Sequence, residues 1–380
     1  MAVKKNLLIV NDLLIGGGVE RLMLDLISCW NQKYNITVMT FDFCENSKNI
    51  LPQNVEYMSA SLPWEWAQNI FQKLVTKICR KMHRIILYQK LKKKHFDILL
   101  CMKDGWIMKR SERLQFIPTR LAWVHTDYTS YYYTYGIFGG KQNELLCMKT
   151  FKDVICVSDT VRKNIQSVLG DPGNLVVKYN PIQVKEIQKK AEEPVVDIET
   201  KRSSGVTRFV TVGRLNYQKG YDLLLEACHM LEREGLKYEV WVIGGAESWS
   251  DEHYRLYRSK NRMKVENVHF LGERKNPYKY MKYADWFLST SIFEGYSLVS
   301  QEAAVLDIPL MLTDCSGVRE LLGNSEYGIV MGISVLDIYE NMKRVIEHPE
   351  LREFYRQKIM ERKKVINFED RVREIEVLLE

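Results

Sequence analysis

Two glutamates lie eight residues apart in the stretch 291–302, which reads Ser-Ile-Phe-Glu-Gly-Tyr-Ser-Leu-Val-Ser-Gln-Glu. The apolar residues 286–288 predict a buried strand before it, and the pattern after Gly295 predicts a helix. A strand that turns through glycine onto a helix N-terminus presents free backbone N–H groups, which suit an anion such as phosphate. Glu294 precedes the helix and Glu302 lies about 7 Å along its axis, so a carboxylate could accept hydroxyl hydrogen bonds on each side of that anion. This layout suits a nucleotide-sugar, although solvated acids on an ordinary loop would have the same spacing.

A second charged loop follows the strand predicted at 208–213. Arg214 and Lys219 lie five residues apart in this loop, between Gly213 and Gly220. A guanidinium can bind two phosphate oxygens at once and an ammonium acts as a point charge, so the loop also favours an anion. Solvated charges on a surface loop are the alternative.

Together these stretches resemble the retaining GT-B glycosyltransferases of the large fourth sequence family, the glycosyl transferases group 1 of bacterial cell-surface polysaccharide synthesis. The resemblance rests on Phe-Glu-Gly-Tyr-Ser-Leu with a second Glu eight residues after the first, and on Val-Gly-Arg-Leu followed by Lys-Gly. It implies that Glu294 holds the transferred sugar and that Glu302 holds the ribose. Arg214 and Lys219 would stabilise the departing nucleoside diphosphate. The other donor-binding residues that it implies in this half of the chain are Gly213, Gly244, Gly295, Tyr296, Ser297 and Leu298.

A glycine-rich loop near the N-terminus could contact the same donor. The predicted strand 7–10 leads to three consecutive glycines at 16–18. Their spacing is not G-x-G-x-x-G and the Walker lysine is missing, so neither a dinucleotide loop nor a P-loop is indicated. A flexible connector is one interpretation. In the resembled family, however, a Gly-Gly-x-Glu loop at this place faces the donor, which matches Gly17, Gly18 and Glu20.

His125 comes directly after the predicted strand 121–124. A lone histidine at such a place is commonly a structural hydrogen-bonding group. The resembled family has a histidine at this strand end that contacts the donor sugar, so the resemblance implies a catalytic role for His125. The loop 128–135 that follows is rich in tyrosine, which stacks on sugar rings and bonds to hydroxyls. This loop either contacts the acceptor or packs its own aromatic rings.

Parallel strands are the elements expected to position these residues. Short apolar runs alternate with helical patterns, which predicts an α/β protein with doubly wound sheets and ligands at the carboxyl ends of the strands. Residues after 336 are expected to be helical. The expected strands are at 7–10, 36–39, 55–57, 97–100, 121–124, 154–157, 175–177, 208–213, 268–272, 286–288 and 310–313, with one more that ends at 242–245.

The chain of 380 residues exceeds one comfortable core, so two domains are expected. By the resemblance these are Rossmann-like domains that face a cleft, as in GT-B enzymes. The expected parts are an acceptor-binding domain at 1–181, a polar linker at 182–206, a nucleotide-sugar-binding domain at 207–367 and a final helix at 368–380 that packs back on the first domain. One departure from the family is Asp307, which replaces a glycine at a helix–strand turn. Since Asp tolerates left-handed backbone, we expect the turn to persist.

A basic segment lies between Glu65 and Asp97, where no acidic residue occurs. Its cations cluster on about a third of a helical turn and apolar residues fill the opposite side, which predicts a basic amphipathic helix around 71–94. Such a helix suits an anionic membrane surface. Its apolar face could instead pack on the sheet of its own domain, and the two interpretations are compatible. No nucleic-acid-binding motif accompanies the segment, so no nucleic-acid partner is expected.

The composition is that of a globular protein, with 46% hydrophobic and 27% charged residues and a net charge of +7. The cysteines form no C-x-x-C pair, so we expect them to be reduced. No apolar run is long enough to span a bilayer, and the N-terminus does not resemble a signal peptide. The expected location is the cytoplasm, peripheral on the inner face of the plasma membrane.

The expected function is retaining transfer of a hexose-type sugar from a nucleoside-diphosphate donor, most simply a UDP-sugar, to a saccharide acceptor that is lipid-linked. No D-x-D triplet occurs, so neither a metal clamp nor another cofactor is expected. Two alternatives stay open. A nucleotide-sugar epimerase of the same fold would convert the donor without an acceptor, and a non-catalytic protein would only bind it.

Overall fold

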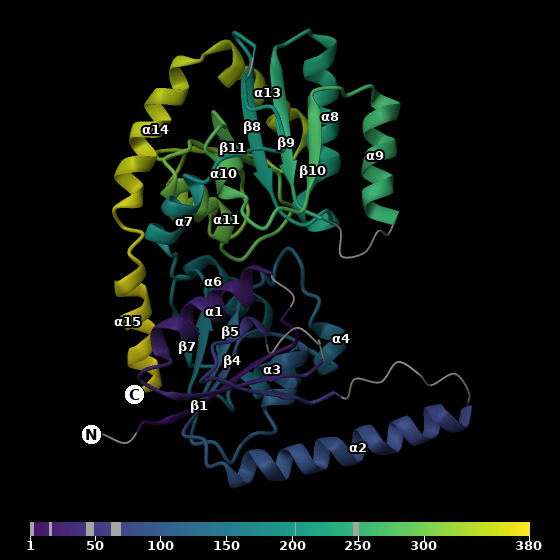
Figure 1. Ribbon diagram of the computed structural model, residues 1–380, viewed down its shortest axis with the longest axis vertical. Coiled ribbons are helices and arrows are strands. Elements are labelled where there is room, and N and C mark those ends of the chain that lie inside the picture. The colour runs from purple at the N-terminus through teal and green to yellow at the C-terminus, as the bar shows by residue number, and fades with distance from the viewer. Residues whose placement is uncertain (1–3, 15–16, 43–48, 62–69, 202, 246–250) are drawn as a thin grey trace. The chain divides into compact units, whose positions relative to one another are not determined.

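The computed structural model describes residues 4–14, 17–42, 49–61, 70–201, 203–245 and 251–380, without the side chains of 70–76 and 251–254 (Figure 1). The chain divides into two compact units. Unit 1 comprises Met1–Asn180 together with Asp370–Glu380, and unit 2 comprises Pro181–Glu369. Each unit consists of one parallel sheet with helices packed on it.

The sheet of unit 1 has seven strands in the order β3-β2-β1-β4-β5-β6-β7, and every neighbouring pair is parallel. Its central strands are buried on both faces, which explains why they are short continuous apolar runs rather than alternating patterns. The strands are β1 (Asn6–Asn11), β2 (Asn35–Thr40), β3 (Glu56–Ser59), β4 (Ile98–Cys101), β5 (Thr119–Val124), β6 (Asp153–Cys156) and β7 (Leu175–Val177).

Most helices of unit 1 lie between these strands in the sequence and pack on the sheet (Figure 1). The first of them buries Leu22, Leu26 and Ile27, the three residues whose spacing predicted that face. The last of these helices begins after residue 367 and is hydrogen-bonded to the first half of the chain. Its Arg371 side chain donates to the carbonyl of Asn180. The helices are α1 (Gly18–Trp30), α2 (Ile70–Lys93), α3 (Trp106–Ser111), α4 (Tyr135–Phe138), α5 (Lys141–Met148), α6 (Asp159–Leu169) and α15 (Phe368–Leu379).

The sheet of unit 2 has six parallel strands in the order β10-β9-β8-β11-β12-β13. Trp286 and Phe209 pair across its centre and are fully buried in the core. The strand β13 was not predicted, because it is only three residues long and its pattern is short. The strands are β8 (Thr207–Val212), β9 (Tyr238–Ile243), β10 (Val268–Gly272), β11 (Trp286–Ser289), β12 (Leu310–Thr313) and β13 (Ile329–Met331).

The segment expected as an exposed linker contains a helix, α7 (Val184–Ala191). Ile187 and Ala191 lie on one face of it and are buried, and the helix packs on α10 and α11. The i, i+4 pair is too short a pattern to stand out among the flanking charges. The other helices of unit 2 are α8 (Tyr221–Arg233), α9 (Asp251–Met263), α10 (Tyr278–Met281), α11 (Leu298–Val305), α12 (Val318–Leu322), α13 (Val335–Glu347) and α14 (Glu350–Lys363), with a short 3-10 turn η2 (Tyr217–Lys219).

The turn at Asp307 persists, as expected. Its φ is +57°, in the left-handed region that a glycine would adopt more easily. The Asp307 carboxylate accepts a hydrogen bond from Lys363, so the side chain that replaces glycine also ties α11 to α14. Among the described residues, no helix combines the length and apolar character needed to cross a bilayer.

Candidate functional site

The strand order of each sheet reverses at one place, which is where ligands bind in open parallel sheets. In unit 2 this switch point lies between β8 and β11, and in unit 1 between β1 and β4. The predicted residues Arg214 and Lys219 follow β8, and Glu294 follows β11. The topology therefore brings the two charged loops together, although they are about seventy-five residues apart in the sequence.

Lys219 and Glu294 form an ion pair at this switch point. The Lys219 Nζ donates to Glu294 Oε1 at 2.6 Å, and the two side chains are 17% and 11% exposed. The hydroxyl of Ser291 donates to the same oxygen at 2.8 Å. Glu294 Oε2 has a 3.5 Å contact with the amide of Gln218, which is at the limit for a hydrogen bond. Oε2 thus keeps most of its capacity to accept a hydroxyl.

Glycines let the backbones of these loops approach each other closely. A Cβ on Gly244, whose φ is +150°, would lie 1.9 Å from the carbonyl oxygen of Gly213. A Cβ on Gly220, at φ +60°, would lie 2.1 Å from the carbonyl oxygen of Thr290. On Gly213 a Cβ would meet the side chain of Lys219 at 2.8 Å, so this glycine also makes room for that lysine. Only glycine fits these positions without a shift of backbone or side chain.

The helix α11 begins beside the ion pair, with Ser297 as its N-cap. The Ser297 hydroxyl accepts from the backbone N–H of Ser300, which leaves the other N–H groups of the first turn available. Gly295 and Tyr296 are buried, and Leu298 is the first helical residue. Glu302 accepts a hydrogen bond from Tyr278 at 2.9 Å, and Arg214 is exposed.

The switch point of unit 1 holds a charged cluster that the motifs did not reveal. Lys103, two residues after the end of β4, donates to Asp12 at 2.8 Å and to Glu20 at 2.5 Å. Burial alone lowers the pKa of Lys103, but the carboxylates of Glu20 and Asp12 outweigh it and raise that pKa above its ordinary value. Glu20 is only 4% exposed, so this predicted donor-binding residue points inward to the lysine.

Gly17 and Gly18 position that glutamate. Gly17 precedes α1 in extended backbone, and Gly18 is the first helical residue. A Cβ on Gly17 would lie 2.2 Å from Glu20 Oε2, so the glycine lets the carboxylate fold back against the helix start. The described part of the Gly-rich loop therefore supports the Lys103 cluster.

His125 lies at the carboxyl end of β5, next to the same cluster. Its ring stacks on Trp123 with centroids 5.6 Å apart. Burial, with a smaller contribution from the Lys103 cation, lowers the pKa of His125 to about 3, so the ring is neutral at physiological pH. Its Nε2 and the Oδ2 of nearby Asp104 are buried with no hydrogen-bond partner among the described residues. Burial also raises the pKa of Asp104.

In the tyrosine-rich loop 128–135, some rings pack inward and others are exposed. Tyr128 and Tyr132 both donate to the buried carboxylate of Glu144, at 2.8 and 2.9 Å. These rings therefore hold the loop to α5. Tyr131 and Tyr133 are exposed and stack on each other with centroids 5.7 Å apart. The loop is thus fixed by its inward rings and presents others to solvent.

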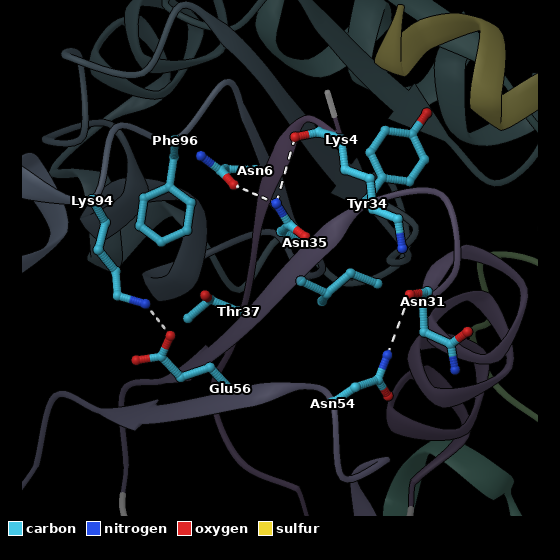
Figure 2. Close-up of a pocket in the computed structure, with 11 residues that line it drawn as sticks. Lys4, Asn6, Asn31, Tyr34, Asn35, Thr37, Asn54, Glu56, Lys94 and Phe96 are labelled. Atoms are coloured by element: carbon cyan, nitrogen blue, oxygen red, sulfur yellow. Dashed lines mark hydrogen bonds and ion pairs between the residues drawn. The ribbon is translucent and has the colours of Figure 1, made fainter. Parts of the chain in front are cut away.

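A surface pocket of about 330 Å³ lies elsewhere in unit 1 (Figure 2). It is lined by Asn6 and Asn35 at the amino-terminal starts of β1 and β2, and by Lys94, which points toward Glu56. No predicted site residue lines it. Since ligands of parallel sheets bind at the carboxyl ends of the strands, we do not assign the active site to this pocket.

Several residues of the two clusters were missed by the sequence reasoning. Lys103 and Asp104 follow β4, and Asp12 follows β1. The rule that carboxyl ends of parallel strands share one edge would have found all three, because each lies within four residues of a predicted strand end. Ser291 begins the stretch 291–302, but no role was predicted for it. In the described parts of the chain, no three His, Cys, Asp or Glu side chains gather as metal ligands would.

Comparison with known proteins found a family model and several relatives that match this chain. Residues 197–362 match the family model of the glycosyl transferases group 1. A Campylobacter jejuni relative, the N-acetylgalactosamine-N,N'-diacetylbacillosaminyl-diphospho-undecaprenol 4-alpha-N-acetylgalactosaminyltransferase, is 26% identical over 92% of this chain and 93% of its own. The Escherichia coli UDP-Gal:alpha-D-GlcNAc-diphosphoundecaprenol alpha-1,3-galactosyltransferase is 26% identical over 68% of each chain.

The same fold occurs in solved structures of low sequence identity. Anabaena HepE in complex with UDP superposes with a TM-score of 0.76 over 98% of this chain and 99% of that one, at 15% identity. Both units of this chain are thus matched, each with its parallel sheet. Residues 197–362, which make up most of unit 2, thus belong to the glycosyl transferases group 1, and the chain as a whole has the GT-B fold.

Proposed function

We propose that this glycosyltransferase moves a hexose-type sugar from a UDP-sugar to a lipid-linked saccharide in cell-surface glycan synthesis, with retention of the anomeric configuration. The observation that carries the proposal is the Lys219–Glu294 pair beside the N-terminus of α11. A cation, free backbone N–H groups and a hydroxyl-accepting carboxylate meet there. The names of the C. jejuni and E. coli relatives support a diphospho-lipid acceptor, and the UDP complex of HepE supports the donor.

The chemistry that these residues support is mainly electrostatic. The bond between the anomeric carbon and the diphosphate oxygen breaks, and its electron pair leaves with the diphosphate. Arg214, Lys219 and the start of α11 stabilise the negative charge that develops there. The acceptor hydroxyl attacks the anomeric carbon from the same face and gives its proton to the departing phosphate oxygen. Glu294 Oε2 accepts a hydroxyl of the transferred sugar.

The remaining roles belong to the same proposal. Glu302 holds the ribose, and its bond from Tyr278 fixes the carboxylate for that purpose. His125 offers its buried Nε2 to a hydroxyl of the donor sugar, and Gly17 and Gly18 shape the loop that supports it. No metal is needed, since the two cations neutralise the diphosphate. The enzyme works peripherally on the cytoplasmic face of the membrane, where a lipid-linked acceptor would be found.

Lys219→Ala and Arg214→Ala test the proposal. We expect each to lower the turnover of a UDP-sugar by about 100-fold or more, since an electrostatic donor at the leaving group is lost. Turnover is measured as transfer of labelled sugar from a panel of UDP-sugars to lipid extracts that contain polyprenyl-diphosphate saccharides. Lys237→Ala is the matched control, because Lys237 is an exposed lysine before the amino-terminal start of β9.

The products of that experiment separate the alternative functions. A labelled lipid product with the α- or β-configuration of the donor supports a retaining transferase, and an inverted product contradicts retention. An epimerised nucleotide-sugar without any lipid product would identify an epimerase. Binding of a UDP-sugar without conversion would leave only a binding protein. Full turnover in Lys219→Ala would contradict the role proposed for Lys219 in stabilising the departing diphosphate.

A further inference from the structure

The helix α2 combines a charge of one sign with an apolar surface. Every charged residue in Ile70–Lys93 is Lys or Arg, and none is acidic. Four large apolar side chains on it are mostly exposed, namely Ile78 at 51%, Met82 at 57%, Ile85 at 54% and Ile86 at 62%. The sequence continues this pattern upstream, in residues whose side chains are not described. The apolar face that could have packed on the sheet is therefore open.

The exposed side chains form one continuous strip along the helix. At 100° per residue, Ile78, Met82, Ile85 and Ile86 fall within an arc of about 100°. The buried residues Leu87 and Leu91 lie on the other side of the helix. Leu87, the nearer of these two to the strip, is still about a quarter of a turn away. The strip thus faces away from the sheet of unit 1.

The protein holds the helix by that opposite side. His83 Nε2 is 2.9 Å from the carbonyl oxygen of Ser59, at the end of β3. The ring of Tyr88 contacts Phe116 edge to face, with centroids 5.3 Å apart. Just beyond the helix, Lys94 forms an ion pair with Glu56. Figure 1 shows α2 as a long helix along the outside of unit 1. Its orientation relative to that sheet is fixed by these contacts.

The charges decide which partner suits this surface. Lys77, Lys81 and Arg84 are exposed along one border of the strip, where their long side chains can reach past the apolar residues. An apolar strip bordered by cations fits the boundary between anionic headgroups and acyl chains. A second copy of the chain would bring two uniformly basic helices together, which like-charge repulsion opposes.

We propose that α2 is an in-plane membrane anchor whose strip of Ile78, Met82, Ile85 and Ile86 inserts into an anionic bilayer, with its cations at headgroup level. The use of such an anchor rests on the proposed lipid-linked acceptor. The membrane contact itself is argued only from the charges and exposed side chains of α2. Because α2 is fastened to the sheet of unit 1, insertion orients that unit on the lipid surface. This surface is distinct from the residues at the carboxyl ends of the strands.

The test is co-sedimentation of the full chain with phosphatidylcholine vesicles that do or do not contain phosphatidylglycerol. No donor or acceptor is added, so the readout is independent of transfer. We expect the native chain to sediment with the anionic vesicles, and to do so at least about 10-fold less with the neutral ones. Added salt should weaken binding to the anionic vesicles, because it screens the headgroup attraction.

Two variants separate the apolar from the electrostatic contribution. Ile85→Gln with Ile86→Gln keeps the charge and a helix-forming side chain, and should lower the anionic-vesicle partition coefficient about 10-fold. Lys77→Gln with Lys81→Gln and Arg84→Gln should lower it at least as much and reduce the salt dependence. The matched control is Leu336→Gln with Phe354→Gln, which removes two exposed apolar side chains of unit 2 and should change nothing.

Three results would overturn the proposal. The native chain could stay in the supernatant with both vesicle types, or the control could lose binding as much as the α2 variants do. Sedimentation velocity could instead show a dimer in solution that Ile85→Gln with Ile86→Gln converts to a monomer, which would assign the strip to a second copy. Calorimetric UDP-sugar binding without vesicles, measured on the same proteins, reports failure of the proposed function separately.

Discussion

The switch points of the two sheets carry lysine–carboxylate clusters of opposite character. In unit 2, Lys219 and Glu294 are both partly exposed, and one oxygen of the carboxylate is nearly free. In unit 1, Lys103 binds two carboxylates, one of which, Glu20, is almost fully buried. The first cluster can exchange its contacts for a ligand at small cost. The second cannot, because an unpaired carboxylate would stay behind in a buried place.

The comparison shows that similar charges at equivalent places of two similar sheets need not have the same task. The unit 1 cluster satisfies its own charges and holds the loops after β1 and β4. What it offers a ligand are two buried polar atoms, the Nε2 of neutral His125 and the Oδ2 of Asp104, whose pKa burial raises. The unit 2 edge offers net positive charge through Arg214 and the start of α11. It therefore suits a diphosphate, and the unit 1 edge suits hydroxyls.

The largest expected effect is the loss of stability when the lysine of each cluster is replaced. Lys103→Met should lower the free energy of unfolding by about 3–5 kcal/mol, because buried Glu20 loses its counter-charge. Lys219→Met should lower it by only about 1–2 kcal/mol, since Ser291 still donates to Glu294. Urea unfolding followed by circular dichroism near neutral pH measures both. The double variant Lys103→Met with Glu20→Gln should recover part of the loss. Equal losses for the two single variants would contradict the distinction.

A second pair of variants compares the glycines of the two edges. Gly244→Ala should cost about 3 kcal/mol, because its Cβ would meet the backbone oxygen of Gly213 and its φ is +150°. Gly17→Ala should cost less, about 1 kcal/mol in unfolding, since its Cβ meets the end of the Glu20 side chain and no backbone atom. Thermal unfolding compares them, with Gly136→Ala, where nothing lies within 4 Å, as the control. A greater loss of stability for Gly17→Ala than for Gly244→Ala would contradict this difference between a side-chain and a backbone contact.

The smallest expected effect concerns pH. Folded His125 has a pKa of about 3, whereas in the unfolded chain it takes up a proton near its ordinary pKa of about 6.5. Its lowered pKa therefore costs nothing well above pH 6.5, and stability falls as the pH drops from there toward 3. Between about pH 7 and pH 5, the native chain should lose about 2 kcal/mol more than His125→Gln does.

Urea unfolding at the two pH values measures that difference. Comparison with the variant is needed because Asp104 and Glu144, whose pKa values burial raises, change stability in the opposite direction over acidic pH. The same measurement on His348→Gln, at an exposed histidine, gives the background. Parallel pH profiles for the native chain and His125→Gln would show that the histidine is not buried in its neutral form.

Much of the fold could be predicted from the sequence, because buried parallel strands are short continuous apolar runs. Residues such as Leu7–Val10 and Trp286–Leu288 are unambiguous in this respect, and the α/β fold and the family were confirmed. Elements with weak sequence patterns were not predicted. The helix α7 has only two buried residues, and the strand β13 is three residues long. The predicted roles of the site residues stay predictions.

The amino-acid sequence by itself determined which residue types lie at the strand ends, since the motifs around Arg214, Lys219 and Glu294 are local patterns. It also determined that α2 is basic and amphipathic. Only the tertiary structure decided the partners. It brought Lys219 to Glu294 and turned Glu20 inward to Lys103. It also left the apolar strip of α2 exposed. The physical reason is that pairing and burial depend on strand order and on the approach of distant backbones, which no local pattern contains.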